Sequence, residues 1–325
     1  MSILVTGGCG FIGTNFIKRV LQFYPDYKIV NVDKLTYAAN KYNHVEYDCD
    51  PRYILIPIDI GSTEVASVIQ NHKPTAIVNF AAESHVDNSI KDSSPFFETN
   101  VMGTLSLLET CRRNITWDYR FIHVSTDEVY GSLNPGDPEF TEETPYDPRS
   151  PYSASKAASD HIVSAYHHTH GMPTIITNCS NNYGPYQHPE KFIPVVISKA
   201  LNDEKIPVYG TGQNIRDWLY VIDHCDALIN VLWKGKIGEK YCIGGNTQID
   251  NLSLARKILK IMGKSESLIE FVEDRKGHDF RYAIDTMKID RDLGWQPVTS
   301  LNKGLKLTVD WYLNNNKWLK QAKKA

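Results

Sequence analysis

The sequence predicts an α/β fold in which a doubly wound parallel sheet is followed by a smaller α/β domain. Apolar strand-like runs alternate with amphipathic helical segments through the first half of the chain, as in a parallel sheet with helices on both faces. The first run leads into a glycine-rich turn and a helix, which is the Rossmann dinucleotide-binding pattern. A length of 325 residues allows about two domains. After two N-terminal strands, further strands are predicted at residues 53–58, 76–80, 121–124 and 174–176.

The first element is a short apolar strand at residues 3–5, followed by a glycine-rich turn at 6–13 and a helical pattern. Glycine suits this turn because a Cβ would block the tight turn, the approach of a pyrophosphate and the packing of the helix on the sheet. The phosphates are then expected at the helix N-terminus. The predicted cofactor contacts in this segment are Gly7, Gly10, Phe11, Ile12 and Gly13.

The second strand, residues 29–32, ends in Asp33. A carboxylate about twenty residues past the glycines can hydrogen-bond the ribose hydroxyls of an adenosine. Because it repels a 2′-phosphate, Asp33 favours NAD over NADP, although the adjacent Lys34 weakens that preference. The alternative is an ordinary glycine-rich turn followed by a solvated Asp.

The next two strands end in turns that carry Asp59-Ile60 and, after the following strand, Ala81-Ala82. Ligands bind at the carboxyl edge of open α/β sheets, so both turns are expected to face the cofactor. Small alanine side chains let the backbone approach a nucleotide closely. The alternatives are helix capping for Asp59 and an ordinary turn position for the nearby His85.

The strand at 121–124 is followed by Ser125, Thr126, Asp127 and Glu128. Two adjacent carboxylates where a parallel strand stops can act as a paired acid and base. Neighbouring side chains alternate in direction on an extended chain, so both reach one substrate only if the strand end bends. Shared negative charge favours protonation of one of them. The alternative is a helix cap or ordinary turn carboxylates.

A helix is predicted from the N-cap residue Ser150 to a stop at Gly171. Tyr152 and Lys156 are four residues apart and share one face of this helix. A Tyr beside a Lys suits proton removal from an alcohol, because the ammonium stabilises a phenolate. Tyr-x-x-x-Lys also occurs by chance on many helices, so its neighbours carry the functional hypothesis.

The second half of the chain contains a polar and aromatic loop from Asn181 and separate basic groups, Lys191, Arg216, Arg275 and His278. The formal net charge is −3, so an anionic substrate must be held by a local basic cluster. Arginine binds phosphate oxygens bidentately, and we expect these groups to converge on one diphosphate. Each of them alone is more often a surface ion pair of little energetic value.

The composition is that of an ordinary globular protein, with 42% hydrophobic and 22% charged residues. Its slightly negative charge gives no reason to expect nucleic-acid binding. No apolar stretch is long enough for a bilayer and no signal-like segment precedes the first strand, so we expect a cytoplasmic protein without a membrane partner. The six cysteines lack metal-ligand spacing, so we expect neither a disulfide framework nor a metal.

Several segments together resemble the dTDP-glucose 4,6-dehydratase family of extended short-chain dehydrogenases/reductases. The resemblance covers essentially the whole chain. Its most specific element is the Thr126-Asp127-Glu128 step, because epimerases of the superfamily usually carry small hydroxyl residues there and GDP-mannose dehydratases have a Ser-Glu pair. The segments that carry it are the glycine turn, residues 125–131, 151–156, 178–186, 277–279 and 281–285.

This resemblance implies dehydration of a nucleotide sugar with NAD as a retained catalyst. Oxidation at C4 makes the C5 proton acidic, water leaves across C5 and C6, and hydride returns to C6. Tyr152 is expected to take the C4 hydroxyl proton, Glu128 the C5 proton, and protonated Asp127 to donate to the departing hydroxyl. The implied catalytic residues are Thr126, Asp127, Glu128, Tyr152 and Lys156.

The resemblance also implies a full set of binding residues. Besides the glycine turn and Asp33, the cofactor contacts are Lys34, Thr36, Asp59, Ile60, Ala81, Ala82, Ser84, Thr99, Tyr152, Lys156 and Asn182. The substrate contacts are Ser84, Thr126, Asn181, Lys191, Phe192, Pro207, Val208, Tyr209, Arg216, Asn251, Arg275, His278 and Tyr282. We expect residues 1–177, completed by part of 215–245, to form the NAD-binding domain and residues 178–325 mainly the nucleotide-sugar domain.

Two positions depart from the family pattern, since Asn88 and Phe280 stand where many bacterial members have Arg. They leave the nucleotide open, and UDP-glucose remains an alternative because plant UDP-glucose 4,6-dehydratases carry the same Ser-Thr-Asp-Glu step. A nucleotide-sugar 4-epimerase uses the same Tyr, Lys and NAD but has no use for the carboxylate pair. A non-enzymatic NAD sensor needs neither Tyr152 nor the basic cluster.

The family suggests a homodimer built by helix packing. A helix predicted at 95–111 offers one apolar stripe for this contact. The alternative, and the commoner fate of such a stripe, is packing against the sheet. The stripe consists of Phe97, Val101, Leu105 and Leu108.

Overall fold

The computed structural model describes residues 1–40, 42–275 and 277–322. Its largest unit is a seven-stranded sheet in the order β10-β6-β5-β4-β1-β2-β3, in which every pairing is parallel. The predicted doubly wound sheet is confirmed. From β1 the chain moves outward first in one direction and then in the other, and ligands bind at such switch points. The strands are β1 (Ser2–Thr6), β2 (Lys28–Val32), β3 (Tyr53–Ile56), β4 (Ala76–Asn79), β5 (Arg120–Thr126), β6 (Thr174–Cys179) and β10 (Lys240–Ile243).

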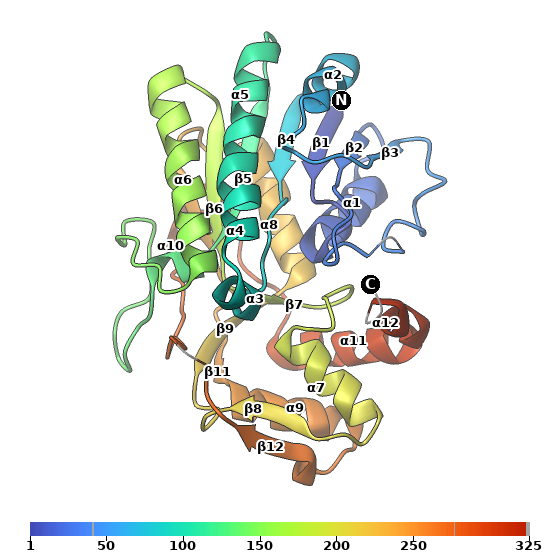
Figure 1. Ribbon diagram of the computed structural model, residues 1–325, viewed down its shortest axis with the longest axis vertical. Helices are drawn as coiled ribbons and strands as arrows, with labels where there is room; N and C mark the ends of the chain where they lie inside the picture. The colour runs from blue at the N-terminus through green and yellow to red at the C-terminus, as the bar shows by residue number, and fades with distance from the viewer. Residues whose placement is uncertain (41, 276, 323–325) are drawn as a thin grey trace.

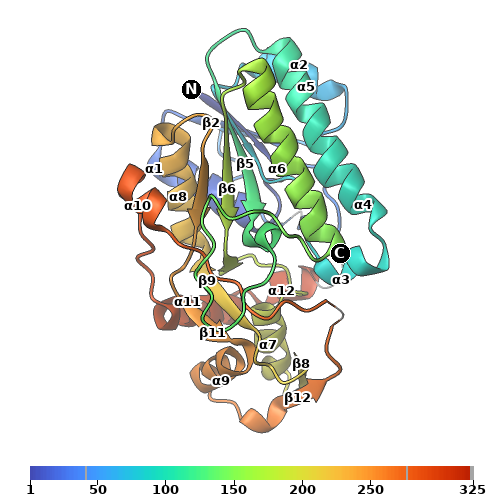
Figure 2. The same ribbon diagram turned by 90° about the vertical axis from the view of Figure 1, so that its left-hand side faces the viewer.

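Helices cover both faces of this sheet (Figure 2). Ile3 and Val5 of β1 pack with Phe16 of α1 on one face, while the intervening Leu4 packs with Leu107 of α5 on the other. This alternation follows from the two-residue period of a strand, and each such buried side chain contributes about 1.5–3 kcal/mol. The helices are α1 (Phe11–Phe23), α8 (Val221–Lys234) and α10 (Met287–Leu293) on the first face, and α2 (Glu64–His72), α5 (Thr104–Asn114) and α6 (Pro151–His170) on the second.

A smaller α/β unit lies below the carboxyl ends of the large sheet (Figure 1). Its strands form one three-stranded sheet, β11-β9-β7, and one pair, β12-β8. After β9 the chain returns to the large sheet through α8 and β10, so the elements of the smaller unit are not continuous in the sequence. The elements are β7 (Asn181–Tyr183), β8 (Ile206–Tyr209), β9 (Ile215–Tyr220), β11 (Gln248–Asp250), β12 (Ile269–Val272), α7 (Phe192–Leu201), α9 (Asn251–Met262), α11 (Leu301–Asn314) and α12 (Asn316–Ala322).

Several strand ends differ from the prediction by one to three residues, and those of β3 and β6 have clear causes. β3 ends at Ile56, two residues early, because Pro57 has no N–H for the ladder. β6 continues past Ile176 to Cys179 through polar but fully buried residues. One of them, Asn178, donates to Asp160 Oδ2 at 3.1 Å and to a backbone carbonyl of β5 at 3.2 Å. A search for apolar runs misses such residues, because buried polar groups are tolerated when they are hydrogen-bonded.

The helix predicted at 95–111 is present, since the chain is helical from Ser94 to Asn114, but its middle part is π-helical and its predicted apolar stripe is not buried as one face. The structure has α4 (Ser94–Phe96), a π-helical segment Phe97–Gly103 and then α5, preceded by α3 (Val86–Lys91). The wider π turn shifts the helical phase. Phe97 is consequently 41% exposed, whereas Leu107 and Leu108 are both fully buried.

Candidate active site

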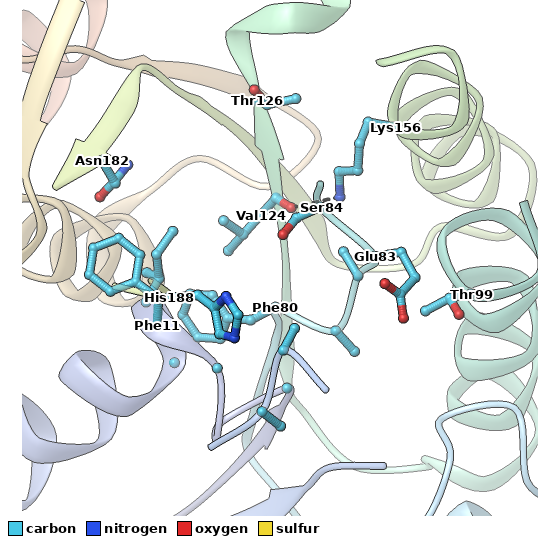
Figure 3. Close-up of a pocket in the computed structure, with 18 of the residues that line it drawn as sticks. Phe11, Phe80, Glu83, Ser84, Thr99, Val124, Thr126, Lys156, Asn182 and His188 are labelled. Atoms are coloured by element: carbon cyan, nitrogen blue, oxygen red, sulfur yellow. Dashed lines mark hydrogen bonds between the residues drawn. The ribbon is translucent and has the colours of Figure 1, made fainter. Parts of the chain in front are cut away.

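A cavity of about 290 Å³ lies where the carboxyl ends of the large sheet meet the second domain. Figure 3 shows side chains from several strands and from α6 around it. Every predicted catalytic and cofactor residue lines this cavity, and so do the predicted substrate residues Ser84, Thr126, Asn181 and Lys191. The structure therefore brings these positions together, while their individual roles stay predictions.

The glycine turn packs so tightly that a Cβ would clash, and it leaves its backbone open to close approach by a ligand. Gly7 has φ +67°, and a Cβ there would lie 2.7 Å from the backbone N of Ala81. A Cβ on Gly13 would lie 2.6 Å from the carbonyl oxygen of Gly7. Helix α1 begins at Phe11 with Gly10 as an N-cap that offers no side-chain hydrogen bond. The first amides of α1 thus remain available, and they fit the pyrophosphate of a dinucleotide.

Asp33 lies at the end of β2 and is held by backbone amides. Its Oδ2 accepts from Cys9 N and its Oδ1 from Leu35 N, both at 2.8 Å. Each carboxylate oxygen can accept a further hydrogen bond, as ribose hydroxyls require. Lys34 is paired with Asp59 at 2.8 Å, so its ammonium is already neutralised. Asp59 also accepts from Gly61 N at 2.8 Å, but α2 begins at Glu64 with Thr63 as its N-cap, so the capping role considered for Asp59 is wrong.

The bend required after β5 is present. β5 ends at Thr126, and a 3₁₀ turn covers Asp127–Tyr130. The Thr126 hydroxyl accepts from Glu128 N at 3.3 Å and donates to Asp127 Oδ1 at 3.3 Å. The other Asp127 oxygen, Oδ2, is buried and has no partner among the described residues. Both carboxyl groups line the cavity.

The two carboxyl groups experience different surroundings. Burial and the charge of Glu128 raise the pKa of Asp127 well above its usual value. Burial also raises the pKa of Glu128, but the cations Lys191 and Arg275 oppose that increase. A proton is therefore best retained on Asp127 and a negative charge on Glu128.

Helix α6 begins and ends as predicted. Ser150 and Ser153 form a reciprocal capping box, and Gly171 at the C-terminus has φ +65°. Tyr152 and Lys156 lie in the first turns, and Lys156 Nζ donates to Val124 O at 2.9 Å (Figure 3). Burial and the nearby carboxylates raise the pKa of Tyr152 well above its usual value. Burial lowers the pKa of Lys156.

The remaining predicted substrate contacts lie outside the cavity lining. They are Phe192 at the start of α7, Pro207, Val208 and Tyr209 on β8, Arg216 on β9, Asn251 at the start of α9, and Arg275, His278 and Tyr282 after β12. Val208 is 1% exposed, so its side chain belongs to the core and only its backbone could meet a ligand. Contact between this group and a nucleotide stays a prediction.

The two arginines differ in their surroundings. Arg216 is 6% exposed, donates to the carbonyls of Asp279 and Phe280 at 3.0 and 3.3 Å, and stacks on Tyr282 at 4.2 Å. Arg275 pairs with Asp87 at 3.4 Å, and its buried Nε has no partner among the described residues. Arg216 is therefore also a structural residue, whereas Arg275 keeps donors for a ligand.

The two departures from the family pattern leave uncharged contacts. Asn88 Nδ2 donates to the hydroxyl of Tyr37 at 3.2 Å. Phe280 is 36% exposed, and its backbone N donates to Ser132 Oγ at 2.9 Å.

The cavity also contains residues that the sequence patterns did not single out, namely Glu83, Cys179, Gln187, His188 and Glu190. The pKa of His188 falls to about 4, first through burial and then through the charge of Lys191. The sequence signals for these residues were the turn after the fourth strand for Glu83, the segment 178–186 for Cys179 and the polar loop from Asn181 for the others. Among the described residues, no group of His, Cys, Asp or Glu is arranged to hold a metal ion.

Comparison with known proteins places the chain in a family. A family model described as GDP-mannose 4,6 dehydratase matches residues 4–308. The dTDP-glucose 4,6-dehydratase of Xanthomonas campestris pv. campestris (strain B100) is 50% identical, over 97% of this chain and 94% of that protein. The dTDP-glucose 4,6-dehydratase 1 of Escherichia coli (strain K12) is 47% identical, over 99% and 96%. The chain belongs to the dTDP-glucose 4,6-dehydratase family.

Solved structures agree with membership of the dTDP-glucose 4,6-dehydratase family. The enzyme of that name from Bacillus anthracis str. Ames, solved in complex with NAD, has a TM-score of 0.92, 46% identity and 99% coverage of both chains. DesIV from Streptomyces venezuelae, solved with NAD bound, has a TM-score of 0.95, 45% identity, and coverage of 99% and 100%. A UDP-glucuronic acid 4-epimerase from Bacillus cereus has a TM-score of 0.90 at 30% identity, over 97% and 99%. Because an epimerase shares the fold, only the site separates the two activities.

Proposed function

We propose that this protein catalyses the NAD-dependent dehydration of dTDP-glucose to dTDP-4-keto-6-deoxyglucose. The observation that carries the proposal is the pair Asp127 and Glu128, buried in the same cavity as Tyr152, Lys156 and the glycine turn. Membership of the family supports the substrate and the reaction. The geometry of the glycine turn and Asp33 supports NAD as the cofactor.

The first step is oxidation of the sugar. When bound, NAD supplies hydride acceptance from C4 and hydride return to C6. Tyr152 takes the proton of the C4 hydroxyl, and Thr126 hydrogen-bonds the same oxygen. Burial makes the Tyr152 phenolate costly, so a nearby positive charge must stabilise it. A unit charge about 4 Å away is worth roughly 4 kcal/mol at an effective dielectric of about 20, or about three pKa units. We assign this role to Lys156.

The second step is elimination of water from the 4-keto sugar. Glu128 removes the C5 proton, which the neighbouring ketone has made acidic. Asp127 gives its proton to the departing C6 hydroxyl. The bend after β5 lets both side chains reach the cavity, and the opposite electrostatic surroundings assign base and acid to them.

An epimerase is the strongest competing activity, because it shares this fold. It needs the alcohol-oxidising pair Tyr152 and Lys156 but no acid and base for elimination. The buried carboxylates at the end of β5 therefore favour dehydration. Every relative described above that is more than 40% identical carries the dTDP-glucose 4,6-dehydratase name, which disfavours UDP-glucose.

The proposal is tested by incubating purified protein with dTDP-glucose, UDP-glucose and GDP-mannose in parallel. We expect a 4-keto-6-deoxy product mainly from dTDP-glucose, without added oxidant and without stoichiometric NADH. Formation of a C4 epimer, or one NADH released for each product, would contradict the proposal. Preference for UDP-glucose would overturn the nucleotide assignment alone.

We also propose a homodimer and a cytoplasmic location. Ile90, Phe97 and Met102, between 41% and 57% exposed, lie in neighbouring parts of α3 and the π-helical segment and favour burial by a second copy. Light scattering of the purified protein tests the dimer. No helix within the described residues is both long and apolar enough to cross a membrane. The cytoplasmic location stays a prediction.

A further inference from the structure

A buried polar network lies behind the active-site lysine. Asp160 follows Lys156 by one turn of α6, and the two residues are 1% and 3% exposed. Asp160 Oδ2 accepts from the Tyr146 hydroxyl at 3.0 Å and from Asn178 Nδ2 at 3.1 Å. Its Oδ1 lies 3.3 Å from His123 Nε2. A buried carboxylate this well supplied with donors is held in its ionised form.

The protonation of His123 follows from its other neighbours. The Thr6 hydroxyl accepts from Ala81 N at 3.4 Å, and its hydrogen is directed to Asn79 Oδ1 at 2.6 Å. The amide nitrogen of Asn79 therefore faces His123 Nδ1, at 3.1 Å. An amide nitrogen only donates, so Nδ1 must accept and the ring proton must lie on Nε2.

In this neutral tautomer, the protonated ring nitrogen of His123 is the one that lies beside Asp160. The Nε2 proton is donated to Ser159 Oγ at 3.1 Å, while Asp160 Oδ1 lies 3.3 Å from Nε2 and accepts no hydrogen bond among the described residues. Burial, followed by the positive charge of Lys156, lowers the pKa of His123, so the ring stays neutral. Tyr146 and Asn178 thus hydrogen-bond the carboxylate, and the neutral His123 ring lies beside it without neutralising its charge.

Lys156 needs such a carboxylate. Burial lowers its pKa, and the acidic groups that oppose this change are Asp160 and Cys179. Burial raises the pKa of the Cys179 thiol far above the physiological range, so the thiol stays neutral. The titratable groups whose charge acts on Lys156 are Asp160, one turn further along α6, His123 of β5 and Cys179 of β6. Asp160 is thus the permanent negative charge among them.

We propose that Asp160 is the counter-ion that keeps Lys156 charged, and that His123 and Asn79 are positioning residues that hold Asp160 in place. The inference deepens the proposed function, because the Lys156 charge is what stabilises the Tyr152 phenolate during oxidation of the sugar. It links Thr6, at the glycine turn, to the catalytic helix through side chains that touch neither substrate nor cofactor.

The direct test is the titration of Lys156 in protein labelled with ¹³Cε-lysine, without substrate. The Lys156 resonance is identified by its loss in Lys156→Met. In Asp160→Asn the lysine is expected to lose its proton at a pH lower by on the order of one unit or more. Tyr146→Phe is the matched control, since it removes one hydrogen bond to Asp160 and keeps the charge. Its lysine titration is expected to match the wild type.

The second readout is the pH profile of sugar oxidation. Because oxidation needs charged Lys156, its alkaline limb is expected to move to lower pH in Asp160→Asn, with activity retained on the acid side. A purely structural role would lower the rate equally at all pH values. Asp160→Ser tests the same loss of charge if Asp160→Asn does not fold.

An unchanged Lys156 titration in the Asp160 variants overturns the inference, even if the wild type dehydrates dTDP-glucose. The lysine titration needs no turnover, so failure of the proposed function leaves this test intact.

Discussion

Single residues divide the reaction into steps through their local electrostatics. Asp127 has anionic neighbours that add to the effect of burial, whereas Glu128 has cationic neighbours that oppose it. Tyr152 belongs to a separate pair with Lys156 on α6. In the proposed mechanism, oxidation and elimination therefore depend on different side chains.

The half-reactions are expected to separate in two variants. Tyr152→Phe should block the initial oxidation, so no enzyme-bound NADH absorbance appears when substrate is added. Asp127→Asn should leave oxidation possible and slow elimination by about 10²–10⁴-fold, as for loss of a general acid. Rapid-scan absorbance with product analysis measures both steps. An equal loss of both steps in both variants would contradict the division.

Arg275 is expected to act on both the substrate and Glu128. Arg275→Ala should raise the apparent KM. The increase should correspond to a loss of roughly 2–5 kcal/mol of substrate-binding free energy if the arginine pairs a desolvated phosphate. Removing its charge also raises the pKa of Glu128, so the base becomes protonated at higher pH. The acid limb of kcat should therefore move to higher pH.

Arg216→Ala is the comparison for this measurement. Arg216 donates hydrogen bonds to the backbone carbonyls of Asp279 and Phe280. Its loss should therefore lower the thermal stability and the NAD content of the protein as well as raise the KM for the substrate. A normal KM in both variants would mean that the phosphate site lies elsewhere.

At the scale of elements, the N-terminus of α6 controls the position of Tyr152, the proposed base for sugar oxidation. Ser150 and Ser153 satisfy the first amides of the helix reciprocally, and Tyr152 lies within that first turn. Fraying of this turn would displace the hydroxyl from the cavity. Local stability and catalysis are thus coupled at one capping box.

Ser150→Ala is expected to lower the free energy of unfolding by about 0.5–2 kcal/mol, the usual cost of a lost N-cap. The rate of sugar oxidation should fall with it. Ser150→Thr keeps an oxygen acceptor and should retain both properties. Chemical denaturation and single-turnover oxidation are the measurements. Wild-type stability in Ser150→Ala would show that the capping box contributes little.

At the scale of the whole molecule, the C-terminal helices α11 and α12 lie on the side of the smaller unit nearest α1 (Figure 1), and hydrogen bonds connect α12 to the glycine turn. Trp318 Nε1 donates to Asn43 Oδ1 at 2.7 Å, and Asn43 Nδ2 donates to Cys9 O at 2.8 Å. Cys9 N in turn donates to Asp33. The end of the chain therefore braces the glycine turn, where we expect the dinucleotide to bind.

Trp318→Phe is expected to weaken NAD binding roughly fivefold or more, because it removes a hydrogen bond worth about 1 kcal/mol and leaves Asn43 Oδ1 without its donor. NAD content after purification and calorimetric titration measure the change. Trp117→Phe is the control, since Trp117 Nε1 makes a comparable bond of 2.9 Å to Pro74 O, remote from the glycine turn. Equal NAD loss in both variants would indicate general destabilisation.

The sequence determined the features that are encoded over a few residues. The glycine turn follows from steric exclusion of a Cβ, α6 from its cap and stop residues, and the sheet from the alternation of apolar runs with amphipathic helices. The carboxylate pair was visible because Asp127 and Glu128 are adjacent. Such signals persist in any fold that keeps the local backbone conformation.

Only the tertiary structure decided features that depend on packing between distant segments. The phase of the helix after Gly103 was set by a π turn, which no periodicity predicts. The polar extension of β6, the tautomer of His123 and the link from Trp318 to Cys9 each need partners 18 to 275 residues away. Their energies come from burial and hydrogen bonding that exist only once those partners meet, so no local pattern could contain them.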